Sequence, residues 1–177
     1  MVAIFQGVLM VSLGLRGPDS LPGSRGMLAL CLVPWVAATS LGYLMLLPAS
    51  AVFVLPVAAF ELLLLLGYSR FILWMAGKPE RWPQTLVSLL GVQAIINTLN
   101  LPLVYVATSQ EQPGLVVQAA EFGFLAWWLL AMGNIFAKSM DRGIWIGLLL
   151  SVAHFFLYMI LYVSLTQLFG IPIEASS

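Results

Sequence analysis

Five long apolar stretches alternate with short polar segments along the chain. A helix needs about 20 predominantly apolar residues to cross the hydrocarbon core of a bilayer. Each stretch reaches that length, so the pattern predicts an all-α fold, a polytopic membrane helical bundle with five transmembrane helices in one membrane domain, 27–170. The predicted spans are about 27–47, 50–76, 85–107, 115–137 and 144–169.

A shorter apolar stretch, VAIFQGVLMVSLGL at 2–15, precedes the first span. It is too short to cross a bilayer. No basic residue precedes it and no small-residue cleavage site follows, which is unlike a secretory signal peptide. We expect a short N-terminal interfacial helix, lying in the membrane surface or docked on the protein, with a Gly- and Pro-rich connector at 16–26. Residues 171–177 are expected to form a tail.

The third predicted span is polar in its middle. Gln93, Asn97 and Asn100 are spaced i, i+4, i+7, so a helix places them on one face. An unpaired amide in hydrocarbon costs several kcal/mol. We therefore expect the other spans to cover this face, which makes the third span the centre of the bundle.

Small residues four apart occur on two other spans and allow close approach of a neighbouring helix. Ala38 and Gly42 form such a pair on the first span, and Gly133 and Ala137 form one on the fourth. Gly147 lies near the start of the fifth span.

Composition supports the membrane class. The 177 residues are 62% hydrophobic and 8% charged, with a mean hydropathy of +1.03, whereas soluble proteins carry about 25% charged residues. The net charge of zero gives no reason to expect a nucleic-acid partner. With one cysteine, Cys31, and one histidine, the sequence predicts no disulfide, no metal site and no cofactor.

The placement of charge fixes a predicted orientation. With five spans, every basic residue falls on one side of the membrane, and Glu111 and Glu174 fall on the other. The positive-inside rule then places the N-terminus in the cytoplasm and the C-terminus on the external or periplasmic side. The basic residues are Arg16, Arg25, Arg70, Lys78, Arg81, Lys138 and Arg142.

Three ionisable residues, Glu61, Glu121 and His154, lie inside predicted spans, where such groups are functional candidates. At about 1.5 Å of rise per residue, Glu61 and His154 lie roughly 15 Å deep, near the midplane. The same arithmetic gives one polar layer across several spans. Its lower members are Glu61, His154 and Asn97, its upper members are Asn100, Gln118 and Glu121, and Gln93 shares the face of the third span.

This layer has two interpretations. It is either a proton or ion relay, or polar pocket for a headgroup or small solute, or it is a set of hydrogen bonds that fixes helix packing. A neutral Glu61 donating one hydrogen bond would satisfy the packing interpretation. His154 would satisfy it by donating to a carbonyl or amide.

The catalytic motifs GxSxG and HExxH are absent, as is a P-loop, and the predicted loops are too short for a soluble catalytic domain. We therefore expect a protein that is not an enzyme. Two alternatives stay open: a small transporter or ion-conducting protein built round Glu61, His154 and Asn97, and a membrane-embedded enzyme that uses Glu61 or Glu121 with His154.

The stretch RWPQTLVSLLGVQAIINTLNLP, 81–102, has a basic residue and Gln-Thr before a Gly- and Leu-rich span that ends in Pro. In this, and in its five spans with short loops, the chain resembles bacterial members of the Yip1-like five-span membrane protein family. The resemblance implies a bacterial inner-membrane protein with a non-enzymatic, membrane-organising or partner-binding role. Expected partners are membrane lipids and other membrane proteins or a second copy, docking on 16–26, 77–84 and 138–143.

Overall fold

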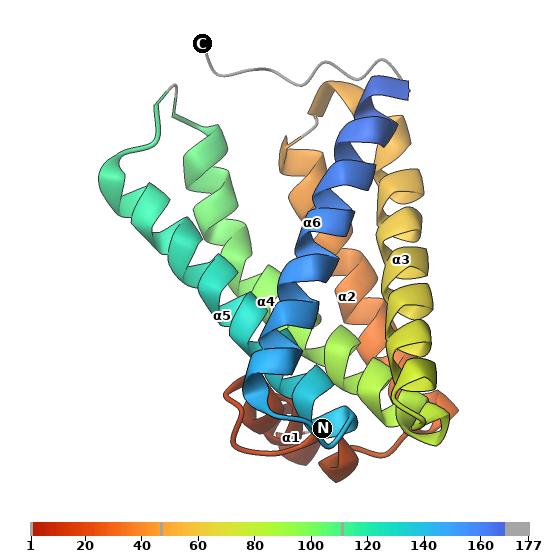
Figure 1. The fold of residues 1–177 in the computed structure, drawn as a ribbon. Coiled ribbons are helices and arrows are strands. Elements are labelled where there is room, and N and C mark those ends of the chain that lie inside the picture. The colour runs from red at the N-terminus through yellow and green to blue at the C-terminus, as the bar shows by residue number, and fades with distance from the viewer. Residues whose placement is uncertain (1, 47, 111, 169–177) are drawn as a thin grey trace.

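The computed structural model describes residues 2–46, 48–110 and 112–168. Within these residues the chain is helical and contains no strand (Figure 1). The α-helices are α1 (Val2–Ser12), α2 (Arg25–Leu46), α3 (Val54–Met75), α4 (Trp82–Thr108), α5 (Leu115–Ser139) and α6 (Ile144–Leu168). Three short 3₁₀ turns, η1 (Pro18–Ser20), η2 (Pro48–Phe53) and η3 (Pro79–Arg81), precede α2, α3 and α4.

The predicted all-α membrane bundle is confirmed. In the described part of the chain, five helices are long and apolar enough to cross a membrane, and they correspond to the five predicted spans. The second span begins as the 3₁₀ turn η2 and becomes α-helical at Val54. Pro56 then occupies the first α-helical turn, where a missing N–H costs no hydrogen bond.

Helix α4 is the most buried span. More than half of its most apolar window is buried, against a third or less in each other span. Residues 85–94 are buried without a break, so every side of this segment is covered. The covering helices are α1, α2, α3 and α5, whereas α6 packs on α5 and α3. The third span is therefore central, although only part of the bundle covers it directly.

The helices do not form a parallel bundle. In Figure 1, α4 and α5 run obliquely, and toward the end far from α1 they diverge from α3 and α6. Helices α5 and α6 meet at their other ends, where Gly147 lies against Gly133 and Ala137. A Cβ at Gly147 would lie 2.8 Å from the backbone nitrogen of Ala137. The predicted small pair on the fourth span therefore forms a helix contact too close to admit a side chain at Gly147.

The other predicted small pair behaves differently. A Cβ added at Gly42 would lie 4.0 Å from Leu101, which is an ordinary contact. The close contact to α4 involves Gly91 instead, whose added Cβ would lie 3.3 Å from the Sγ atom of Cys31 and 3.0 Å from Val8. Ala38 and Gly42 line a cavity, described below.

The N-terminal helix α1 docks on the protein. Val8 and Val11 are buried in the main hydrophobic core against α4 and α5. The indole nitrogen of Trp127 donates to the carbonyl of Ser12 at 3.2 Å. The outer face of α1 exposes Phe5 and other apolar side chains, so one face of the helix packs on α4 and α5 and the other is apolar.

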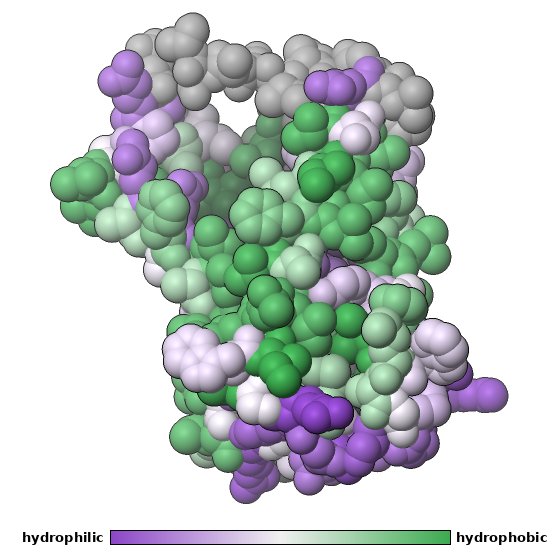
Figure 2. Space-filling model, viewed as in Figure 1, coloured by the Kyte–Doolittle hydropathy of each residue, from purple (hydrophilic) through white to green (hydrophobic). Residues whose placement is uncertain are grey.

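All seven basic residues lie at one end of the bundle, in or next to the connections α1–α2, α3–α4 and α5–α6. We call it the basic end; it is the purple surface at the bottom of Figure 2, below a broad apolar band. Two of the helices end there in tight turns that use a residue with positive φ. Gly77 has a positive φ of 68° and ends α3, while Asp141, with φ of 54°, follows α5. Glu111 and Glu174, expected at the other end, lie outside the described residues.

Candidate functional site

A cavity of about 330 Å³ lies in the half of the bundle away from the basic end, where the helices diverge. Figure 2 shows the surface hollowed between α5 and α6 at this level. We call it the polar cavity because nine of its lining side chains carry hydrogen-bonding groups, one of them the indole of Trp128. The others are Thr39, Tyr43, Glu61, Asn97, Asn100, Glu121, His154 and Tyr158.

The structure thus brings five of the seven predicted site residues to one cavity. Glu61 comes from α3, Asn97 and Asn100 from α4, Glu121 from α5 and His154 from α6. Four helices therefore supply the five predicted residues, and α2 adds Thr39 and Tyr43 to the same lining.

Gln93 and Gln118 lie elsewhere. The carbonyl of Gln93 accepts a 2.7 Å hydrogen bond from the indole N–H of Trp35, and its amide lies 3.5 Å from the sulfur of Met132. Gln93 is therefore a satisfied polar group inside the core. The amide of Gln118 donates to the carbonyl of Pro113 at 2.9 Å and stays exposed near the start of α5.

Glu61 ends a chain of three hydrogen-bonding groups. The hydroxyl of Tyr43 donates to its Oε2 at 2.8 Å, and the hydroxyls of Tyr43 and Tyr158 are 2.6 Å apart. The ring of Tyr162 stacks on that of Tyr43 at 6.3 Å. This arrangement can move a proton along the three groups by reversing the direction of each hydrogen bond. Glu61 and His154 share the cavity, but no hydrogen bond joins them in the described residues.

His154 is 2% exposed, and neither ring nitrogen has a hydrogen-bond partner among the described residues. Its ring packs against Tyr68 at 5.0 Å and Trp128 at 6.0 Å. The hydroxyl of Tyr68 is not available to it, because that group donates to the carbonyl of Leu150 at 2.6 Å. A buried polar group without a partner is unusual in a folded protein and calls for an explanation.

The two asparagines of α4 differ in whether their side chains find a hydrogen-bond partner. The amide of Asn97 donates to the hydroxyl of Thr39 at 3.0 Å. The Oδ1 atom of Asn100, one turn further toward the open end, is buried and has no partner in the described part of the chain. The cavity therefore offers two side chains, His154 and Asn100, with unused hydrogen-bonding capacity.

Sequence reasoning missed Tyr43 and Tyr158. A usable signal existed for Tyr158, which follows His154 by four positions and so shares its helix face. For Tyr43 no signal existed, since its partner Glu61 lies on another helix and helix orientation decides the contact.

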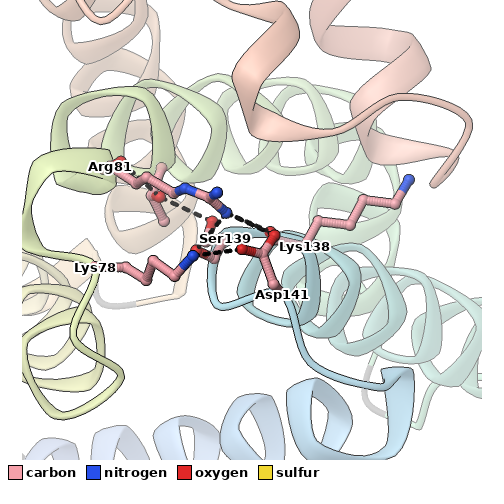
Figure 3. Close-up of polar contacts among 6 residues, drawn as sticks. Lys78, Arg81, Lys138, Ser139 and Asp141 are labelled. Atoms are coloured by element: carbon pink, nitrogen blue, oxygen red, sulfur yellow. Dashed lines mark hydrogen bonds and ion pairs between the residues drawn. The ribbon is translucent and has the colours of Figure 1, made fainter.

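A second polar site lies at the basic end (Figure 3). The carboxylate of Asp141 lies between Lys78, at 2.6 Å, and Arg81, at 2.8 Å. The Arg81 and Lys78 hydrogen bonds lower the pKa of Asp141 to about 2. Lys138 donates to the carbonyl of Gly14 at 2.7 Å. These contacts join the connections between α1 and α2, α3 and α4, and α5 and α6 to one another.

No group of three or more His, Cys, Asp or Glu side chains in the described residues is placed to hold a metal ion. Comparison with known proteins finds no match: no family model, no curated protein and no solved structure matches this chain. The fold defines an integral membrane protein with five spans, and its role has to be argued from the polar cavity.

Proposed function

We propose that this chain is a non-enzymatic integral membrane protein that binds a small polar ligand, a solute or a lipid headgroup, in the polar cavity. The observation that carries the proposal is His154, which is almost fully buried, lines the cavity and has both ring nitrogens unpartnered. A neutral imidazole offers one donor and one acceptor. A ligand in the cavity would satisfy them.

The packed core between the polar cavity and the basic end favours ligand binding over ion conduction. Trp35, Leu65 and Phe136 have no exposed surface and fill the core on the basic-end side of the cavity. A continuous ion path would have to cross this core. The cavity is therefore better suited to binding a ligand than to conducting an ion. A carrier function would require the contact between α5 and α6 at Gly147 to open.

A second role, in partner binding, is proposed for the basic end. The connections there are held together by Lys78, Arg81, Lys138 and Asp141, so they present one continuous polar surface. We propose that this end is cytoplasmic, because basic loops are retained on that side. A reporter fused after Glu174, outside the described residues, should then read external; a cytoplasmic signal there would reverse the assignment.

The ligand proposal is tested by filling the cavity. Gly42 lines it and has room for a side chain, whereas Gly67 on α3 has open space around it and does not line the cavity. Protein purified in mild detergent is extracted, and bound small molecules are identified by mass spectrometry. Wild type and Gly67→Phe should carry the same ligand and Gly42→Phe should lack it. Identical recovery from all three proteins would overturn the proposal.

A further inference from the structure

The polar cavity is lined by two carboxyl groups and by no lysine or arginine. The two carboxyl groups belong to Glu61 and Glu121. All seven Lys and Arg side chains of the chain belong to the basic end. An ionised carboxylate inside a bilayer is costly without a partner. Within the described residues, only His154 could supply a positive charge to the cavity, and neither of its nitrogens contacts a carboxylate.

The tyrosine chain does not supply the missing positive group. Tyr43 supplies the one side-chain hydrogen bond that Glu61 receives within the described residues, and it goes to Oε2. A hydroxyl stabilises an anion through its dipole but brings no charge. Glu121 is exposed to the cavity and its surroundings and has no ion pair in the described structure. An anionic ligand would disfavour ionisation of these carboxyl groups, whereas a cationic ligand would stabilise their ionised forms.

The walls of the cavity suit a cation as well. The rings of Phe124, Trp128, Phe155 and Tyr158 line it. Trp128 and Phe155 lie 6.2 Å apart with their planes at 65°, so they form a corner in which two rings meet at an angle. Aromatic faces attract cations, and groups of them recognise ammonium ligands.

The unpartnered side-chain atoms indicate which hydrogen-bonding groups the ligand needs. Asn100 Oδ1 is an acceptor, and His154 offers an acceptor together with a donor. A ligand with an N–H or O–H group next to its positive charge could satisfy Asn100 or His154 while the charge faces the carboxylates.

We propose that the ligand of the polar cavity is a monovalent ammonium cation, recognised by the carboxylates of Glu61 and Glu121 and by the aromatic ring of Trp128. This inference rests on the proposed ligand-binding function and names its substrate class. The ammonium group belongs either to a free amine or to a zwitterionic lipid headgroup, which share this chemistry.

The test compares two probes of the same shape, choline and its uncharged isostere 3,3-dimethylbutan-1-ol. The protein is placed in nanodiscs of phosphatidylglycerol, which carries no ammonium group. Binding is measured by saturation-transfer NMR on the methyl signals and by the ¹⁵N signals of His154, the single histidine of the chain. We expect choline to bind at least about tenfold more tightly than the alcohol. Equal binding of the two probes, or tighter binding of the alcohol, would overturn the cation assignment.

Variants locate the effect. Glu61→Gln and Glu121→Gln should each weaken choline binding several-fold and leave the alcohol unchanged. Glu80→Gln is the matched control, because Glu80 lies at the basic end away from the polar cavity. The comparison of the two probes on the wild-type protein needs no variant, so it decides the assignment even where a variant fails to fold.

The outcomes separate the two proposals. If the alcohol binds as tightly as choline and Gly42→Phe abolishes the binding of both, the cation assignment is refuted and the ligand-binding function stands. If choline does not bind but wild type still co-purifies with a ligand that Gly42→Phe lacks, the cation assignment is again refuted and the ligand-binding function stands. Choline binding that Gly42→Phe leaves intact refutes both proposals. Nanodiscs of phosphatidylcholine that suppress choline binding identify the headgroup as the source, and undiminished binding there identifies the free amine.

Discussion

The contact between α5 and α6 gives a sharp test of the fold, because backbone atoms surround it. A Cβ at Gly147 would meet the carbonyl oxygen of Gly133, and would lie 2.8 Å from both the nitrogen and the Cβ of Ala137. Real Cβ atoms almost never approach closer than 3.0 Å. The atoms met are backbone or the first side-chain carbon, so no rotamer change relieves the clash. Gly147→Ala therefore has to push the two helices apart.

The size of the effect follows from two opposing terms. Overpacking costs up to about 3 kcal/mol, and replacing a helical glycine with alanine returns about 1 kcal/mol. We expect Gly147→Ala to lose about 2 kcal/mol of unfolding free energy. Gly133→Ala should lose less, since its added Cβ would meet the backbone of Leu148 at 3.1 Å. Gly123→Ala, with open space at its Cβ, should be neutral or slightly stabilising.

The assay is reversible unfolding of the purified protein in mixed micelles with increasing SDS fraction, followed by far-UV circular dichroism. The expected order of midpoints is Gly123→Ala highest, then Gly133→Ala, then Gly147→Ala. A Gly147→Ala midpoint equal to that of Gly123→Ala would mean that α5 and α6 do not touch here, and the divergence of the helices that opens the polar cavity would lose its basis.

Three further changes probe named hydrogen bonds by the same unfolding assay. The hydrogen bonds from Arg81 and Lys78 lower the folded-state pKa of Asp141 to about 2, so the stability that Asp141 adds is present above about pH 4 and is lost as pH falls through 2. Asp141→Asn, which keeps a residue tolerant of positive φ, should differ from wild type above about pH 4 and converge with it only below about pH 2. Tyr43→Phe should lose about 1–3 kcal/mol, because Glu61 is left without its donor, and wild-type stability would contradict the hydrogen-bonded chain. Trp35→Phe should lose a similar amount by orphaning the Gln93 carbonyl, and adding Gln93→Leu should recover most of it; a double variant that is weaker still would contradict this account.

The number and boundaries of the membrane helices could be predicted from the sequence because bilayer thickness fixes their length. The central position of α4 was also predictable, since Gln93 and Asn97 must find partners in a medium that supplies none. The docking of α1 on the protein was left open by its length and composition alone. Buried Val8 and Val11, together with the Trp127 bond to Ser12, settle it as a protein contact.

The composition of the site was only partly predictable. Depth along each helix placed Glu61, His154 and Asn97 at a similar height, and they do line one cavity. Depth says nothing about rotation or tilt, which depend on packing against neighbours. For that reason Gln93 was grouped with the polar layer although it bonds Trp35 in the core. Gln118 was also expected in that layer, but its side chain bonds the Pro113 carbonyl instead.

The choice between packing and binding for the polar residues can be argued residue by residue. Gln93 and Asn97 have protein partners at 2.7 and 3.0 Å, so helix packing explains them completely. His154 and Asn100 have no such partner among the described residues, although their unpaired atoms are buried. A packing role would have selected an apolar residue there, since leaving a buried polar group unpaired costs about 1–3 kcal/mol. On α4, the satisfied Asn97 and the unsatisfied Asn100 lie within one turn of each other, and Asn100 lies closer to the open end of the cavity. The polar residues therefore fall into two groups: Gln93 and Asn97 bond neighbouring helices, whereas His154 and Asn100 keep buried polar atoms that packing does not explain.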